Sequence, residues 1–134
     1  MKEFKKIALI AHDGKKQEIG RHMQLIAIEE PEIHLHPKFQ SMLADMFLEA
    51  YHKYNIHFII ETHSEYLIRK TQVFVAESRY ESEEELRRNN PFKVYYLPQR
   101  EKTYELEYRK DGKFSNEFET GFFDEASNLI FKIL

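Results

Sequence analysis

The order of apolar and polar segments in this 134-residue chain predicts an α/β fold. The expected architecture is a parallel sheet with flanking helices, followed by a C-terminal antiparallel hairpin and a last helix. Two observations support it. A segment with apolar residues at helical spacing separates two short apolar runs, and strands joined through a helix pair in parallel by a right-handed crossover. Aromatic-rich segments that partly alternate in polarity come next, which favours antiparallel strands.

Three short apolar runs predict the strands of the sheet. Residues 4–11 and 25–28 have the character of buried strands, and residues 57–62 suit a sheet buried on both faces. Pro31 closes the second strand, because proline has no N–H to donate to a ladder. Residues 37–54 carry apolar side chains at helical spacing and start with a proline, which is well tolerated in a first turn.

Further helices are expected from capping and periodicity signals. Asn55 is a stop for the preceding helix, and Ser64 can cap a helix over residues 65–77. Residues 78–90 are the most charged stretch and predict a solvated helix or loop. The last amphipathic helix is expected over residues 124–133.

The antiparallel part is expected over residues 92–97 and 103–108, two aromatic-rich strands. Asp111 and Gly112 predict a tight turn that leads to a short segment at Phe114. Tyrosines on these strands can either dock a partner protein or simply pack against the last helix. They are Tyr95, Tyr96, Tyr104 and Tyr108.

Composition excludes several classes of protein. The chain has a domain-sized length, is 42% hydrophobic and has no apolar run longer than five residues, so it can form a core but predicts no membrane helix. Its net charge of −3 argues against strong non-specific binding to nucleic acid. The absence of cysteine excludes disulfides and thiolate chemistry, and is compatible with a cytoplasmic location.

The glycines exclude a phosphate-binding loop. The chain contains only Gly14, Gly20, Gly112 and Gly121. No two of them have the spacing of a P-loop, which needs glycines five apart followed by Lys and Ser or Thr. A G-x-G-x-x-G dinucleotide motif is equally absent.

Charged and polar side chains follow two of the predicted strands where those strands end. Glu29 and Glu30 end one strand, and Thr62 and His63 end the next. The carboxyl ends of parallel strands share one edge of a sheet, so we expect these residues to lie close together. One carboxylate there can hold Mg²⁺, a second can orient or deprotonate water, and a histidine can contact a terminal phosphate. Alternatively, the acidic residues are solvated loop residues.

A second candidate is the pair His34 and His36. Two histidines separated by one residue can ligate a metal, with Glu32 as a third ligand. Because Pro37 follows at once, the alternative interpretation is that these residues only lead the chain into a helix.

These motifs match a known family when taken together. Residues 25–37, LIAIEEPEIHLHP, resemble the Walker B motif and following loop of ABC-type P-loop ATPases, and are closest to the OLD-like AAA-family branch often found in phage defence. Residues 58–64, FIIETHS, resemble the switch-histidine strand of that branch. Residues 92–97 and 121–125 resemble its C-terminal extension, so the resemblance covers about residues 24–134.

The resemblance implies part of a P-loop NTPase sheet and a site that uses ATP and Mg²⁺. Glu29 would support Mg²⁺, Glu30 would polarise the attacking water, and His63 would sense the γ-phosphate. Thr62 is assigned to cofactor binding. Residues 34–37 would approach the opposite subunit, because such sites are completed across a head-to-tail dimer.

Two family motifs are missing, namely the P-loop and the signature loop that precedes the Walker B strand. We therefore expect the Walker B and switch-histidine half of an ATPase, truncated and inactive alone. Its partner would be a second copy or a P-loop-bearing subunit, with a nuclease or DNA effector and no membrane. The alternative functions are a non-enzymatic interaction module and a methylglyoxal synthase-related protein.

The start of the chain resembles a different family. Residues 4–18 are similar to the first strand and loop of methylglyoxal synthase, in which His12 and Lys16 would bind substrate phosphate. The later phosphate loop and catalytic Asp motif of that family are missing, so synthase activity is not expected. Residues 1–23 are expected to be a foreign or engineered N-terminal strand and linker that fills a sheet edge, and residues 24–134 half of an ATPase domain.

Overall fold

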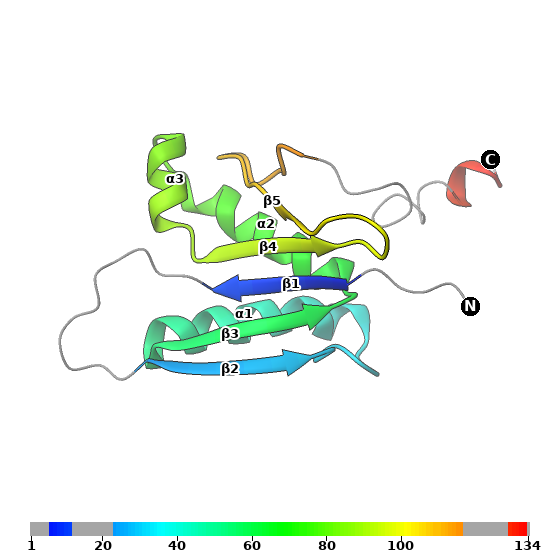
Figure 1. Cartoon of the computed structure of the whole chain (residues 1–134), viewed down its shortest axis with the longest axis horizontal. Helices are drawn as coiled ribbons and strands as arrows, with labels where there is room; N and C mark the ends of the chain where they lie inside the picture. Colours follow the sequence, from blue (N-terminus) through cyan, green and yellow to red (C-terminus); the bar gives the residue numbers. More distant parts are fainter. Residues whose placement is uncertain (1–5, 12–22, 117–128, 134) are drawn as a thin grey trace.

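Five strands form one mixed sheet in the order β2-β3-β1-β4-β5 (Figure 1). The computed structural model describes residues 6–11, 23–116 and 129–133. The strands are β1 (Lys6–Ala11), β2 (Gln24–Glu29), β3 (Ile56–Thr62), β4 (Phe92–Leu97) and β5 (Tyr104–Leu106). The helices are α1 (Pro37–Tyr54), α2 (Glu65–Ser78) and α3 (Glu83–Asn89).

The predicted strand–helix–strand unit is confirmed. Strands β2 and β3 pair in parallel, with α1 as the connection, and their register sets Glu29 opposite Glu61. The two strands therefore end level with each other. The antiparallel pair at the C-terminal side is also confirmed, with Val94 opposite Leu106 in β4 and β5.

Strand β1 was expected to fill a sheet edge as a foreign N-terminal strand, and this prediction is wrong. It lies in the centre of the sheet and pairs in antiparallel fashion with both β3 and β4 (Figure 1). In this place its backbone groups meet a neighbouring strand on either side, which an edge strand cannot achieve. The boundary expected at residue 23 therefore runs between two strands of one sheet.

The prediction of a buried second strand is wrong, because β2 is an edge strand. Within the described residues it pairs with β3 alone, and its Leu25 and Ile26 are 58% and 40% exposed. The prediction that β3 is buried on both faces is also wrong. Ile60 and Thr62 are fully buried on one face, whereas Ile59 on the other is 37% exposed.

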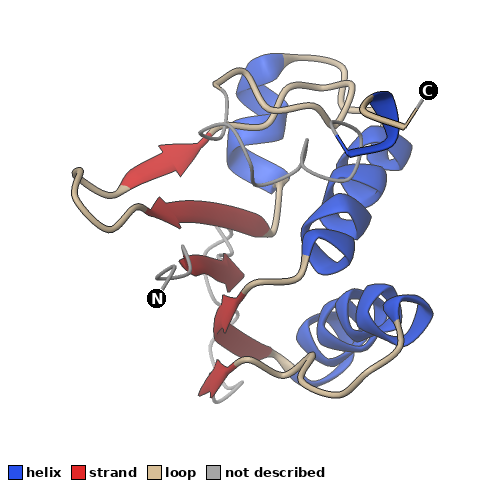
Figure 2. Cartoon of the chain, turned by 90° about the vertical axis from the view of Figure 1, so that its right-hand side faces the viewer, coloured by secondary structure: helices blue, strands red, loops and turns tan. Residues whose placement is uncertain are grey.

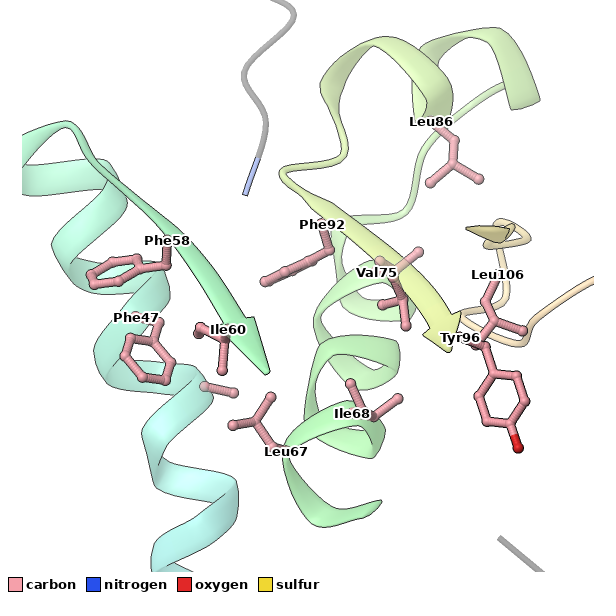
Figure 3. Packing of buried hydrophobic residues seen from close by; sticks show 12 residues of the cluster. Phe47, Phe58, Ile60, Leu67, Ile68, Val75, Leu86, Phe92, Tyr96 and Leu106 are labelled. Atoms are coloured by element: carbon pink, nitrogen blue, oxygen red, sulfur yellow. The ribbon is translucent and has the colours of Figure 1, made fainter. Parts of the chain in front are cut away.

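Among the described residues, α1 and α2 cover one face of the sheet (Figure 2), which accounts for the exposure of Ile59 on the other. Figure 2 shows α1 and α2 on the same side of the strands. The core lies between these helices and the sheet, where Phe47 of α1 packs on Phe58 of β3 with ring centroids 4.8 Å apart (Figure 3). Burial of one such ring stabilises the fold by about 1.5–3 kcal/mol. Ile68 and Val75 of α2, on the same face of the sheet, belong to the same core.

The predicted helix ends are confirmed. His36 is the N-cap of α1, and Asn55 ends it in the left-handed conformation with φ of 54°. The Ser64 side chain caps α2. The charged segment forms α3, with acidic residues in its first turn and basic residues in its last turn, as the helix dipole favours. No helix in the described part of the chain has the length and apolar character needed to cross a membrane.

The turn at Gly112 packs on helix α2. Gly112 has φ of 79°, and a Cβ there would lie 2.2 Å from the Gln72 carbonyl oxygen, so the position requires glycine. The turn brings Tyr108 opposite Phe114 in an isolated bridge. Of the predicted last helix, residues 124–128 lie outside the described residues, and 129–131 are helical.

The structure separates the tyrosines into different environments. Tyr96 is fully buried, and its ring lies 5.4 Å from that of Tyr104. The Tyr108 hydroxyl shares a 2.6 Å hydrogen bond with the buried Thr71 of α2. These contacts favour a packing role for Tyr96, Tyr104 and Tyr108 over partner docking, with α2 rather than the last helix as the contact of Tyr108. Tyr95, Tyr104 and Tyr108 are all half-buried.

The Tyr108 hydroxyl, which is packed against Thr71 of α2, predicts a fall in stability at alkaline pH. Burial raises the pKa of Tyr108, and the hydrogen bond with Thr71 offsets only part of this effect. Above about pH 10 the unfolded chain loses the Tyr108 proton that the folded chain retains, so the free energy of unfolding decreases as pH rises. One retained proton corresponds to a slope of about 1.4 kcal/mol per pH unit.

Tyr108→Phe should therefore flatten this slope by up to that amount, and cost about 1 kcal/mol at pH 7 through the lost hydrogen bond. Urea unfolding between pH 8 and 11 measures both effects. The exposed Tyr66, substituted by Phe, is the matched control. An unchanged alkaline slope in Tyr108→Phe would refute the assignment.

Candidate functional site

The loop after β2 reverses the chain at the carboxyl end of the parallel pair. Glu30 adopts the left-handed conformation with φ of 47°, and its N–H donates to the Glu61 carbonyl at 2.7 Å. This bond extends the ladder by one step. Two further bonds within the loop, from Ile33 N–H to the Glu30 carbonyl and from Leu35 N–H to the Glu32 carbonyl, fold it towards α1.

The two predicted strand ends do meet, through a direct contact between side chains. Glu30 Oε1 lies 3.0 Å from His63 Nε2, and the two side chains are 31% and 27% exposed. Both groups are therefore held by the protein while remaining accessible to solvent. A carboxylate and an imidazole in contact can accept, donate or transfer a proton.

Glu29 lies beside this pair on the open face of the sheet. It is exposed, and its register partner Glu61 shares its face on β3. Neighbouring carboxylates are oxygen ligands of the kind that Mg²⁺ prefers. Among the residues that the structure describes, no three or more ligating side chains are grouped to hold a metal. The carboxylates of Glu29 and Glu61 fit a Mg²⁺ ion that is held by one or two carboxylates and takes its other ligands from water and phosphate.

Thr62 supports the site from below. It is fully buried, and its Oγ1 accepts a hydrogen bond from Ser64 N–H at 3.0 Å. This contact shapes the turn on which His63 sits. The cofactor-binding role of Thr62 stays a prediction, and the contact that the structure shows for its hydroxyl is with the turn.

Ser64 links the two helices to the loop. Its Oγ accepts from Leu67 N–H at 3.1 Å, which caps α2, and donates to Gln40 Oε1 of α1 at 2.7 Å. The Gln40 amide in turn donates to the Leu35 carbonyl at 2.9 Å. The sequence indicated Ser64 only as a cap, and no local signal pointed to Gln40, because its partner is 24 residues away.

The predicted metal ligands His34, His36 and Glu32 are not grouped together in the structure. His34 and His36 are both exposed, and His36 Nδ1 accepts from Lys38 N–H at 3.3 Å as the cap of α1. Glu32, the third ligand in that hypothesis, is buried and turned to the end of β3. Its Oε1 accepts from His63 N–H at 2.7 Å.

A separate cavity of about 480 Å³ lies between α3, β4 and β5. Its lining includes Arg87, Lys93, Glu105 and Arg109, and no residue before Glu83. Cations and anions are balanced in its lining, which also includes Glu83 and Glu107, and Lys93 pairs with Glu105. Because its lining residues all lie at or after Glu83, the cavity is distinct from the site at the ends of β2 and β3.

Comparison with known proteins gives one family match, and it covers part of the chain. A family model described as AAA ATPase domain matches residues 4–68, just under half of the chain. The matched range contains β2, α1 and β3 with Glu29, Glu30 and His63, and it supports an AAA-family ATPase part in the chain. It also spans the segment that resembles methylglyoxal synthase, whose His12 and Lys16 lie outside the described residues. No curated protein and no solved structure matches the chain.

Ser64→Ala should destabilise the fold around the site. The substitution removes the cap of α2 and the hydrogen bond that Gln40 Oε1 accepts from Ser64, which together cost about 1–2 kcal/mol. Chemical denaturation measures the loss. Ser78→Ala is the matched control, because the exposed Ser78 hydroxyl donates only to its own helix. Equal stability of the two variants would show that the Ser64 network contributes nothing.

Proposed function

We propose that this chain supplies the acidic and histidine side of an ATP-hydrolysing site of the ABC type. The observation that supports this most strongly is the 3.0 Å contact between Glu30 and His63 at the carboxyl end of a parallel strand pair. The contact lies inside the range matched by the AAA ATPase domain. The EEPE and ETHS motifs agree with the Walker B and switch-histidine elements of that class.

Each residue has a distinct part in the proposed reaction. Bound Mg²⁺–ATP supplies the γ-phosphoryl group and a metal that neutralises charge on its oxygens. Glu29, exposed at the end of β2, holds the metal directly or through water. Glu30 accepts a hydrogen bond from the attacking water and polarises it. His63 donates from its ring to a phosphate oxygen.

The Glu30–His63 contact also implies an order of events. One Nε2–H donates to one acceptor at a time in a good hydrogen bond, so an incoming phosphate competes with Glu30 for His63. The contact engages Glu30 at Oε1, so when His63 turns to the phosphate this oxygen becomes an additional acceptor for the water.

We propose that the phosphate cradle comes from outside these 134 residues. The four glycines of the chain do not form a P-loop, and backbone N–H groups of such a loop make most phosphate contacts. We therefore propose weak nucleotide binding and no hydrolysis by the chain alone. The cradle comes from a P-loop-bearing subunit, with residues 24–134 as the acidic half in an OLD-like, cytoplasmic assembly. In such a phage-defence assembly, hydrolysis would be coupled to a nuclease or DNA effector.

Reconstitution tests this proposal. The chain is mixed with a P-loop-bearing AAA-family subunit whose own Walker B glutamates are replaced by glutamine, and phosphate release from ATP is followed. We expect hydrolysis only in the mixture, reduced about 100-fold or more by Glu30→Gln. Glu77→Gln, an exposed position on α2, is the matched control. Hydrolysis by the chain alone that Glu30→Gln leaves unchanged would contradict the proposal.

A further inference from the structure

We propose that Glu32 is a positioning residue that keeps Glu30 and His63 in contact; the inference rests on the proposed function for the role of that pair. Glu32 follows Glu30 by two residues in the same loop. Its Oε1 accepts the His63 N–H at 2.7 Å, a contact between residues 31 positions apart. Glu30 meets the ring of His63 at 3.0 Å. One loop therefore holds both the backbone and the side chain of the same histidine.

Burial shows that this carboxylate does more than fill space. Glu32 is only 8% exposed, and taking a carboxylate out of water is costly unless hydrogen bonds compensate. Within the described part of the chain, its second oxygen, Oε2, has no hydrogen-bond partner. An apolar side chain of similar size would fill the position without that cost. The contact with His63 N–H is the compensation that the structure shows.

The backbone of the loop explains why such a tie is needed. Glu30 and His34 have φ of 47° and 65°, in the left-handed region that side chains other than glycine adopt rarely. Conformations of this kind persist when surrounding contacts determine them. The loop is tied to β3 on both sides of Pro31, by Glu30 N–H on the Glu61 carbonyl and by Glu32 on His63 N–H.

His63 is fixed from its other side as well. The next residue, Ser64, donates its N–H to Thr62 Oγ1, and its hydroxyl contacts Gln40. The peptide of His63 therefore lies between two anchored groups. Removing the Glu32 carboxylate releases the His63 N–H from the loop. The imidazole can then move away from Glu30.

Nuclear magnetic resonance tests this role without any hydrolysis. Glu30→Gln should shift the His63 ring signals, because it removes the charge that the ring contacts. We expect the same shift in the Glu32→Gln background, since the amide oxygen can still accept the His63 N–H. In the Glu32→Ala background we expect at least a twofold smaller shift, together with movement of the His63 backbone amide signal. Glu77→Ala on α2 is the background control.

An undiminished response of His63 in folded Glu32→Ala would overturn the inference. Where Glu32→Ala does not fold, Glu32→Asp replaces it, because a side chain one methylene shorter cannot hold the same 2.7 Å contact without moving the loop. Loss of the response in Glu32→Asp supports the role, and a full response refutes it. The readout needs no ATP, so failed reconstitution would contradict the proposed function and leave this result standing.

Discussion

The parallel pairing of β2 with β3 is the constraint on which the site depends. Its register places Glu29 opposite Glu61 and continues one step further through Glu30 N–H and the Glu61 carbonyl. A slip of one residue would turn every side chain of a strand to the opposite face. The 3.0 Å contact between Glu30 and His63 exists only because the two strands end level.

Helix packing maintains this register. Helix α1 connects the two strands, and Phe47 on it packs against Phe58 of β3. In the first turns of α1, Gln40 hydrogen-bonds both to the Leu35 carbonyl in the loop after β2 and to Ser64, the N-cap of α2. The residues proposed to contact substrate and the residues that position them thus differ in burial. Glu30 and His63 remain partly open to solvent, whereas Thr62 and Ser64 beneath them are buried.

The sequence was sufficient for features that have local causes. A proline in the first turn, Asn55 and Ser64 indicated the ends of two helices, because caps are formed by neighbouring residues. The strand–helix–strand pattern indicated the parallel pair and so brought Glu30 and His63 to one place. Features that depend on distant partners were not predictable in the same way.

Strand order is the clearest such feature. An apolar run does not say which strands lie beside it, so β2 was expected to be buried and β1 was expected at an edge. The role of Glu32 is another example, because its partner is 31 residues away. Alternation along β3 turns the Thr62 side chain towards the core, and the sequence did not indicate this burial. The cofactor-binding role of Thr62 stays a prediction.

A titration with Mg²⁺–ATP, followed by nuclear magnetic resonance of the isotope-labelled chain, tests whether the strand-end residues bind the nucleotide. The labelled chain can report binding in the millimolar range. We expect the largest shifts on residues 29–34 and 61–64, and a smaller effect on the Glu29 signal when ATP is added without Mg²⁺. Shifts confined to the cavity between α3, β4 and β5, with none at the strand ends, would contradict this expectation.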